Sequence, residues 1–122
     1  MGELRSKKML AKYLARLTVI AKEADCKLCA LPVIESFTYW NIVPNEYPYD
    51  LIAVTHHMIQ PKRHCTAEEL TVDELRELHD IKRGYINNHY DMITESVTHT
   101  SSIPTHHHLH LMVTRDDIEQ TQ

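Results

Sequence analysis

Residues 105–114 read THHHLHLMVT, a stretch in which every second residue from His106 to His110 is a histidine. A period of two indicates a β-strand, because successive side chains of a strand point to opposite faces of the sheet. We therefore expect a strand over this stretch, with three imidazoles on one face. That face consists of His106, His108, His110 and Met112, and the opposite face of His107, Leu109, Leu111 and Val113.

A row of three imidazoles predicts chemistry rather than packing, because each uncharged ring needs a polar partner. Neighbours on one face of a strand lie about 6.7 Å apart, which is two rises of about 3.3 to 3.4 Å. That spacing suits two ligands of one metal ion, or a row of groups that meets successive parts of a substrate. The spacing alone leaves both interpretations open.

The segment CKLC at residues 26–29 carries two thiols at the spacing of zinc ligands, which is also the spacing of redox cysteines. A zinc site needs further ligands, and the histidine-rich strand can supply them. His64, which follows PKR at residues 61–63, is a second source, and Cys65 is a competing one. We expect Cys65 to be a buried thiol instead.

The composition of the 122 residues is that of one globular domain, with 43% hydrophobic and 25% charged residues. No apolar run approaches the roughly 18 residues of a membrane span. The net charge of −4 is unlike that of a nucleic-acid-binding domain. Only two glycines occur, which excludes Gly-rich phosphate loops. Three cysteines without a recognisable secretory leader predict a reducing, cytoplasmic setting.

The first 23 residues differ in composition from the rest of the chain. They carry six Lys or Arg and two Glu, whereas residues 24–122 carry seven basic and 15 acidic residues. Apolar residues at helical spacing predict an amphipathic helix over residues 4–23. A basic amphipathic helix can lie on a membrane, but we expect an apolar stripe that packs on the core beneath a solvated face.

The middle of the chain shows the signals of two strands and one long helix. Residues 36–43 are aromatic and β-branched and end at a Pro-Asn turn, and a second strand is expected over residues 51–60. Two capping boxes, TAEE and TVDE within residues 66–74, precede apolar residues at helical spacing. They predict a helix to about Tyr90. Residues 94–105, rich in Ser and Thr, predict a loop.

Residues 106–112, HHHLHLM, resemble the histidine-triad (HIT) motif H-φ-H-φ-H-φ-φ, in which φ is apolar, with histidine at the second position. Upstream, NIVPNEYPY at residues 41–49 and HHMIQPKRH at residues 56–64 are similar to the family's segment from its nucleoside-binding strand to its P-K-x-H turn. DCKLC at residues 25–29 resembles the C-x-x-C start of the zinc-containing members. The resemblance covers residues 25–114.

The resemblance implies an α+β fold with a central antiparallel sheet of about five strands and a long helix. We expect residues 25–122 to form this HIT domain and residues 1–24 to form an additional amphipathic helical extension. Members of the family usually assemble as homodimers, so a homodimer is expected here.

The resemblance also implies phosphorus chemistry. In the family the middle histidine of the triad attacks the α-phosphate of a nucleotide and forms a nucleotidyl-histidine, which water or another acceptor resolves. His108 takes that place here, and a neutral imidazole is a competent nucleophile at neutral pH. His110 would contact the phosphate or the leaving group, and His56 resembles a family histidine near the site.

In the zinc-containing branch, two cysteines, the histidine of P-K-x-H and the first triad histidine bind the metal. The matching residues are Cys26, Cys29, His64 and His106. Such a closed Cys₂His₂ set implies a structural Zn²⁺ that fixes the strand bearing the nucleophile.

Two segments depart from the family pattern. Asn41 stands where the family usually has an acidic residue that contacts ribose hydroxyls, and we expect its amide to bond to a sugar hydroxyl. The loop before the triad lacks the family's Gly-Gln-Ser-like sequence, and we expect Ser101 and Ser102 to supply hydroxyls to the phosphate.

The leading hypothesis is a nucleotide hydrolase or nucleotidyltransferase of the HIT type. Its substrate would be a nucleoside phosphoramidate, a dinucleoside polyphosphate or a nucleotide sugar. One alternative is a non-catalytic, zinc-stabilised module that binds nucleotides or proteins. Another is a zinc hydrolase with an open site of three histidines, which would leave the cysteine pair without partners. Neither a membrane nor a nucleic-acid polymer is expected as a partner.

Overall fold

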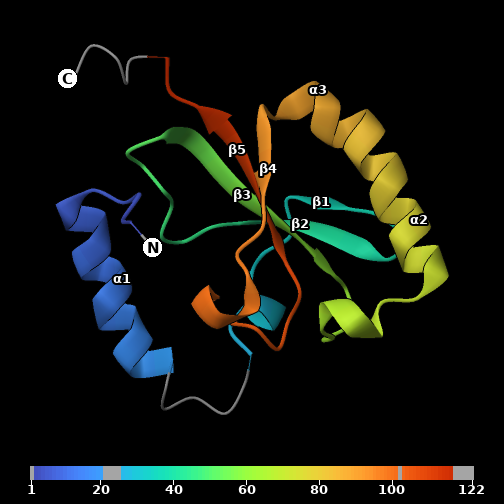
Figure 1. The fold of residues 1–122 in the computed structure, drawn as a ribbon, viewed down its shortest axis with the longest axis horizontal. Coiled ribbons are helices and arrows are strands. Elements are labelled where there is room, and N and C mark those ends of the chain that lie inside the picture. The colour runs from blue at the N-terminus through green and yellow to red at the C-terminus, as the bar shows by residue number, and fades with distance from the viewer. Residues whose placement is uncertain (1, 21–25, 102, 117–122) are drawn as a thin grey trace.

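The computed structural model describes residues 2–20, 26–101 and 103–116. Its centre is one antiparallel sheet of five strands in the order β1-β2-β3-β5-β4 (Figure 1). The strands are β1 (Glu35–Ser36), β2 (Trp40–Pro44), β3 (Ala53–Pro61), β4 (Met92–Thr94) and β5 (Leu109–Thr114). This architecture confirms the predicted α+β fold with about five antiparallel strands.

The long helix predicted behind the capping boxes is present. α2 (Val72–Ile81) begins after Thr71, whose side-chain oxygen accepts a hydrogen bond from the Glu74 N–H at 3.1 Å. The Glu74 carboxylate accepts one from the Thr71 N–H at 2.9 Å, which completes the capping box. The helix continues through a π-helical turn (Lys82–Ile86) into α3 (Asn87–His89). It therefore ends where the apolar periodicity predicted.

The main hydrophobic core lies between this helix and one face of the sheet. Trp40 has no exposed surface, and its indole Nε1 donates to the Glu74 carbonyl oxygen at 2.8 Å. The other buried residues of this core come from the central strands and the helix: Ile42, Ile59, Leu78, Ile81, Ile86, Leu109 and Leu111. One face of each central strand is therefore used for packing.

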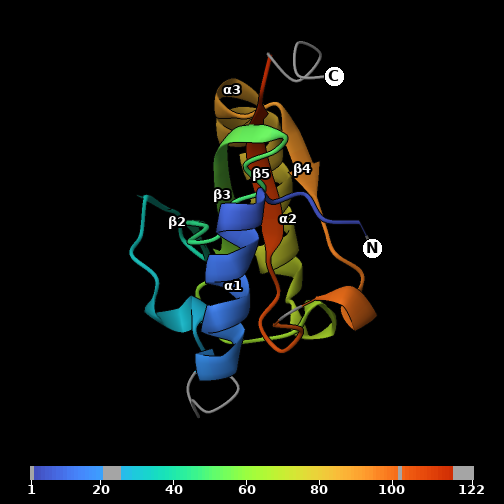
Figure 2. The same cartoon turned by 90° about the vertical axis from the view of Figure 1, so that its left-hand side faces the viewer.

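The opposite face of the sheet looks towards the N-terminal part of the chain. α1 (Lys7–Ile20) and α2 lie on opposite sides of the sheet (Figures 1 and 2). Two small apolar clusters fill the layer on the α1 side, one of Leu28, Val43 and Met58 and one of Tyr49, Ala53 and Met112. No helix among the described residues is long and apolar enough to cross a lipid bilayer.

The strand predicted over residues 36–43 is interrupted by a turn between β1 and β2. The Phe37 N–H donates to the Trp40 carbonyl oxygen at 2.8 Å, which closes the turn. The Glu77 carboxylate of α2 accepts two further backbone N–H groups of this turn, at 3.2 and 2.6 Å. The aromatic stretch is therefore divided between a short edge strand, a turn and β2.

Other predicted elements are present with shifted bounds. The N-terminal helix expected over residues 4–23 is α1, and residues 21–23 lie outside the described part of the chain. The strand expected over residues 51–60 is β3, which begins at Ala53 because the Ala53 N–H donates to the Tyr49 carbonyl oxygen in a turn, at 3.0 Å. β4 was not predicted, because three residues are too few to show a period.

The predicted histidine-rich strand begins only at Leu109, which corrects the expected start at residue 105. β5 pairs with β3 as far as the partners Ile59 and Leu109, and β3 ends two residues later at Pro61, which has no N–H for a ladder. The His107 N–H donates instead to the Cys65 carbonyl oxygen at 2.8 Å. The three consecutive histidines therefore lie in a loop that leads into β5.

Candidate functional site

Two cysteines and two histidines from three separate segments meet beyond the end of β3. Their ligand atoms all lie within 4.8 Å of one another, and the four residues are Cys26, Cys29, His64 and His106. The sulfur atoms of Cys26 and Cys29 lie 3.5 and 3.4 Å from His106 Nδ1. The Cys29 sulfur also lies 3.5 Å from His64 Nδ1. The structure thus brings together the four residues that the resemblance implied.

The donor set fits a tetrahedral metal ion. Zn–S bonds of about 2.3 Å and Zn–N bonds of about 2.1 Å place adjacent sulfur and nitrogen ligands about 3.6 Å apart. The three S···N distances of 3.5, 3.4 and 3.5 Å are close to that value. His106 Nε2 donates to the Pro61 carbonyl oxygen at 3.1 Å, so the lone pair on Nδ1 faces the sulfur atoms. The four residues can therefore hold a metal ion.

Two contacts hold the segments that carry these ligands. Arg63, beside His64, donates to the buried Glu74 carboxylate at 2.8 and 3.1 Å, which ties the turn after β3 to the start of α2. The hydrogen bond from Arg63 outweighs burial and lowers the pKa of Glu74 to about 2. Gln60 Nε2 donates to the Leu28 carbonyl oxygen at 2.8 Å, which ties the cysteine segment to β3.

Cys65, the competing ligand, does not belong to this cluster. The residue is 1% exposed, and burial raises the pKa of its thiol. The structure therefore confirms Cys65 as a buried thiol.

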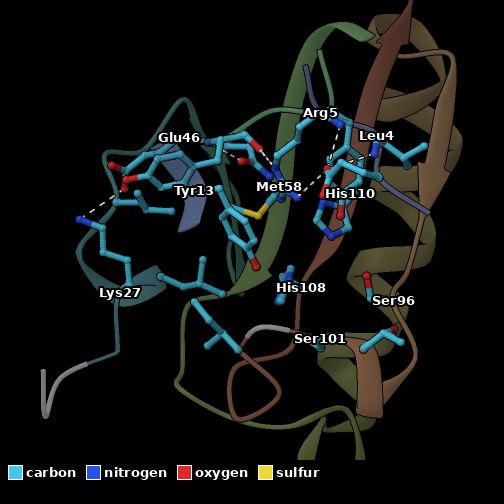
Figure 3. Close-up of a pocket in the computed structure, with 18 of the residues that line it drawn as sticks. Leu4, Arg5, Tyr13, Lys27, Glu46, Met58, Ser96, Ser101, His108 and His110 are labelled. Carbon is cyan, nitrogen blue, oxygen red and sulfur yellow. Dashed lines mark hydrogen bonds and ion pairs between the residues drawn. The ribbon is translucent and has the colours of Figure 1, made fainter. Parts of the chain in front are cut away.

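His108 lies at the wall of a cavity of about 220 Å³ (Figure 3). Its Nδ1 lies 2.9 Å from the His106 carbonyl oxygen, and Nδ1 must donate because a carbonyl oxygen only accepts. The neutral ring then carries its lone pair on Nε2. His108 therefore offers a nucleophilic nitrogen, and the backbone of a metal-site residue fixes its ring.

His110, in β5, has the complementary arrangement of its proton. The Tyr49 N–H donates to His56 Nδ1 at 2.9 Å, so a neutral His56 carries its proton on Nε2. His56 Nε2 lies 2.8 Å from His110 Nδ1, so His110 Nδ1 must accept this proton. The side-chain nitrogen of Asn45 lies farther from His56 Nε2, at 3.3 Å. His110 therefore keeps its own proton on Nε2.

Both rings of this pair are neutral at neutral pH. Burial, followed by repulsion from His110 and Arg5, lowers the pKa of His56 to about 3. Burial, followed by repulsion from His108 and Arg5, lowers the pKa of His110 to about 4. The His108 and His110 ring centroids lie 5.3 Å apart. A nucleophilic nitrogen and a neutral N–H donor thus stand side by side, which suits attack on a centre that gathers negative charge.

His107 lies on the other side of the sheet from these rings. Its ring centroid is 6.1 Å from that of Trp40 in the main core, and its Nδ1 is 3.8 Å from the Glu95 carboxylate. The alternation that the sequence predicted is therefore kept, although the residues before Leu109 are not in a strand.

Of the residues expected to bind the nucleotide, some line the cavity and others do not. Ser101 lines the cavity together with His108, and Ser102 lies outside the described residues. Asn41 is not among the described residues that line this cavity. It pairs with Gln60 in the β2–β3 ladder, and its Oδ1 is buried without a hydrogen-bond partner in the described part of the chain.

No protein-family model and no curated protein matches the chain. Solved structures do match it. An HIT family hydrolase from Legionella pneumophila has a TM-score of 0.53 and 21% sequence identity, over 75% of this chain and 95% of that one. An HIT family hydrolase from Clostridium thermocellum has a TM-score of 0.51 and 19% identity, over 84% of this chain and 90% of that one. The chain has the HIT fold.

One wall of the cavity in this HIT fold is formed by the N-terminal segment, which the sequence did not predict. Residues 2–5 and Tyr13, which lie outside the sequence resemblance, line it together with His108 and His110 (Figure 3). Helical periodicity predicted that the N-terminal helix packs on the core, but no described side chain of α1 belongs to the buried clusters, and Leu14 is 53% exposed. The periodicity carried no signal of which surface the helix would cover.

The remaining walls divide into an apolar and a charged part. The apolar part comes from Leu28, Leu31, Met58 and Ile103. The charged part contains two ion pairs, Arg5 with Glu3 at 3.4 Å and Lys27 with Glu46 at 3.3 Å. A cavity lined by both apolar and charged side chains suits a ligand that has an apolar and a charged part.

Proposed function

We propose that the protein is a nucleotide hydrolase or nucleotidyltransferase that cleaves at a nucleotide α-phosphate through a nucleotidyl-histidine. The observation that carries this proposal is the pair of imidazoles with complementary protons in one cavity. His108 has its lone pair on Nε2, and His110 has its N–H there. The HIT fold, shared with two proteins described as hydrolases, supports the same assignment.

The proposed reaction consists of two displacements at phosphorus. First, His108 Nε2 forms a P–N bond while the bond from phosphorus to the leaving atom breaks, and the leaving group takes the electron pair. His108 Nδ1 keeps its hydrogen, and the His106 carbonyl oxygen faces the resulting positive ring at 2.9 Å. Second, the oxygen of water or of another acceptor attacks phosphorus, the P–N bond breaks, and the lone pair returns to Nε2. In hydrolysis the leaving group takes up a proton from solvent as it departs, the hydroxyl of water later ends on phosphorus, and the proton that this water releases returns to solvent.

His110 acts in this proposal as a hydrogen-bond donor. Its Nε2–H would bond to a non-bridging phosphate oxygen or to the leaving atom, where negative charge increases during each displacement. Because burial holds the pKa of His110 at about 4, the ring donates as a neutral group rather than as a cation.

The substrate class is a nucleotide conjugate, which is a nucleoside phosphoramidate, a dinucleoside polyphosphate or a nucleotide sugar. We propose that the apolar wall covers the nucleoside and that Ser101 and Ser102 contact the phosphate. We also propose that a ribose hydroxyl donates to Asn41, because its buried Oδ1 has no hydrogen-bond partner among the described residues.

The cofactor in this proposal is a structural Zn²⁺ bound by Cys26, Cys29, His64 and His106. Two thiolates and two imidazoles fill a tetrahedral shell, so the ion would supply rigidity and no open position for substrate. His106 would then fix the loop that carries the nucleophile. We further propose a homodimer, which sedimentation velocity can measure, and a cytoplasmic location.

Incubation with a nucleoside phosphoramidate tests the proposed function. We expect release of the amine and the nucleoside monophosphate. We also expect an acid-labile increase in the mass of the intact protein that equals one nucleotidyl group. A protein that binds nucleotides but gives neither turnover nor adduct would support the non-catalytic binding module instead.

A further inference from the structure

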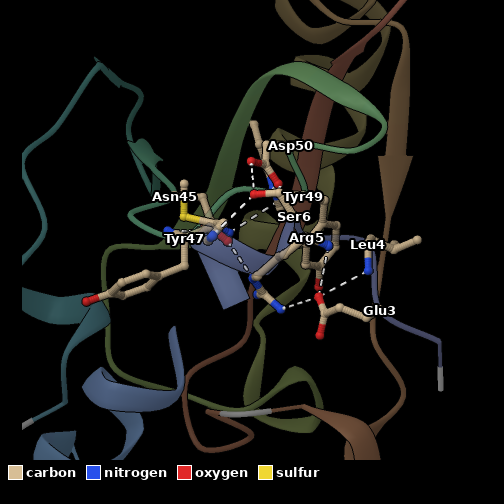
Figure 4. Close-up of polar contacts among 10 residues, drawn as sticks. Glu3, Leu4, Arg5, Ser6, Asn45, Tyr47, Tyr49 and Asp50 are labelled. Carbon is tan, nitrogen blue, oxygen red and sulfur yellow. Dashed lines mark hydrogen bonds and ion pairs between the residues drawn. The ribbon is translucent and has the colours of Figure 1, made fainter. Parts of the chain in front are cut away.

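The segment before α1 is fixed against the triad cavity by backbone and side-chain bonds. The Leu51 N–H donates to the Leu4 carbonyl oxygen at 3.1 Å. The Ser6 N–H and hydroxyl donate to the two oxygens of the Asp50 carboxylate at 2.6 and 2.7 Å (Figure 4). The Ser6 oxygen also accepts from the Met9 N–H at 3.2 Å, at the start of α1. The wall formed by residues 2–5 is therefore a built part of the structure.

Arg5 projects from this segment and has a defined position. Its Nε donates to the Tyr47 carbonyl oxygen at 2.8 Å (Figure 4). Its guanidinium carbon lies 4.0 Å from the ring centroid of Tyr13 and 4.7 Å from that of Tyr49. Tyr49 in turn stacks on the His110 ring, with centroids 5.4 Å apart. Only 12% of the Arg5 side chain is exposed, so the cation is held close to His110.

The guanidinium keeps donors for a further anion. A guanidinium has five N–H groups, and Tyr47 uses one of them. The Arg5 Nη1 lies 3.4 Å from the carboxylate of Glu3, which is a long contact to a side chain that is 38% exposed. Nη2 has no hydrogen-bond partner within the described part of the chain. A phosphate could therefore bind two N–H groups of Arg5 by displacing Glu3.

A phosphate in this cavity also needs a cation, and the neutral rings of His56 and His110 supply none. Among the described residues that line the cavity, two carry a cationic Arg or Lys side chain, and they are Arg5 and Lys27. Lys27 pairs with Glu46 and lies on the far side of the cavity from His110, whereas Arg5 lies beside His110 (Figure 3). Arg5 is therefore the cation placed to meet a phosphate held at the triad.

We propose that Arg5 is a phosphate-binding residue of the active site, which the N-terminal segment adds to the HIT fold. This inference rests on the proposed function, because it takes a nucleotide as the ligand. Glu3 occupies the guanidinium in the absence of ligand, and the nucleotide phosphate takes its place. The same segment thus contributes both the binding group and the carboxylate that competes for it.

Calorimetry with a nucleotide and its nucleoside tests the role of Arg5. We expect Arg5→Gln to weaken the binding of AMP about 10- to 100-fold, as for the loss of a hydrogen bond to a charged group, and to leave the binding of adenosine unchanged. Arg5→Lys should retain part of the AMP affinity, because lysine keeps the positive charge but cannot bind a phosphate through two parallel N–H groups. Glu3→Gln should strengthen AMP binding, since it removes the competing charge and leaves Arg5 in place. GMP and guanosine are measured in parallel because the base is unknown.

The control is Lys12→Gln, which removes an equal charge from the exposed surface of α1 and should change neither affinity. If Arg5→Gln weakens AMP and adenosine equally, Arg5 shapes the wall and does not bind phosphate, and the inference is wrong. Unchanged AMP affinity in both Arg5→Gln and Glu3→Gln would contradict it as well. Wild-type protein that binds neither nucleotide nor nucleoside would overturn the proposed function itself, and the inference with it.

Discussion

His56 Nε2 and His110 Nδ1 lie 2.8 Å apart on the neighbouring strands β3 and β5. Because the Tyr49 N–H occupies the other ring nitrogen of His56, the proton between the two rings belongs to His56. The proton of His110 is thereby kept on Nε2. The donor role that we propose for His110 thus depends on a neutral His56, which contacts the triad from the adjacent strand.

Acid should lower the free energy of unfolding through this pair. The pKa of histidine is about 6.5 in an unfolded chain, whereas it is about 4 for His110 and about 3 for His56 in the folded protein. Between these values the unfolded chain binds more protons than the folded one. The free energy of unfolding therefore falls as the pH is lowered from about 6.5 towards 4. Urea unfolding at a series of pH values measures this slope.

A variant can assign the slope to the pair. In His56→Gln, the side-chain oxygen can accept from the Tyr49 N–H and the nitrogen can donate to His110 without any titration. We expect a shallower slope than in the wild type. Loss of a bound metal in acid affects the wild type and His56→Gln alike, so the difference between their slopes does not contain this effect. His79→Gln, at an exposed position of α2, is the control, and a His56→Gln slope equal to that of His79→Gln would contradict the prediction.

His108→Ala should lower kcat for a nucleoside phosphoramidate by about 10³-fold or more, because it removes the proposed nucleophile. The covalent adduct should disappear, while the thermal midpoint and the metal content stay close to those of the wild type. Stopped assays with mass spectrometry of the intact protein measure both quantities.

His107→Ala is the matched variant at the neighbouring position. The His107 ring packs towards Trp40 on the opposite side of the sheet, so this change should lower the thermal midpoint and leave most of the turnover. Equal losses of turnover in His107→Ala and His108→Ala would mean that the assignment of the nucleophile is wrong.

Removal of one ligand should release the metal. We expect about one zinc per chain in the wild type and far less in Cys26→Ala. The thermal midpoint of Cys26→Ala should fall by more than about 10 °C, because the free energy of binding a structural zinc contributes to folding. Elemental analysis and thermal unfolding, with and without a chelator, measure these effects. Cys65→Ala, which removes a buried thiol outside the cluster, should keep the metal, and metal loss only in Cys65→Ala would contradict the assignment.

The sequence predicted the parts of this site that depend on local periodicity. Alternation over residues 105–114 placed His108 and His110 apart from His107, and the structure keeps this placement although the residues before Leu109 form a loop, in which the His107 N–H donates to the Cys65 carbonyl oxygen. The capping box at Thr71 gave the start of α2 for the same reason, since its hydrogen bonds join residues three apart.

The contribution of the N-terminal segment could not be predicted in this way. Arg5 reaches the cavity because Ser6 bonds to Asp50, a contact between residues that are 44 positions apart. A contact between residues so far apart leaves no periodic pattern in the sequence. The charge of residues 1–23 predicted only a solvated face. Similarly, the pairing of β5 with β3 stops near Pro61, at the end of β3. The pattern of histidines in residues 105–114 holds no information about Pro61.

Asn41 provides the last prediction, which concerns the sugar. Its Oδ1 is buried without a hydrogen-bond partner in the described residues, and the same is true of Oε1 of Gln60, its partner in the ladder. A ribose hydroxyl that reached Asn41 would satisfy one of these acceptors. A carboxylate in its place would accept a charge-assisted bond, which is about twice as strong as a neutral one.

We therefore expect Asn41→Asp to tighten the binding of AMP by about 3- to 10-fold, with no comparable gain for 2′-deoxy-AMP. Calorimetry with the two nucleotides measures the difference. Asn41→Ala is the matched variant, and it should reduce the preference for the ribose form. The carboxylate would also lie close to the unpartnered oxygen of Gln60, so the free energy of unfolding of Asn41→Asp should fall in the absence of ligand. If that free energy falls and neither sugar responds, Asn41 is a structural residue of β2, and the ribose is bound by side chains that line the cavity.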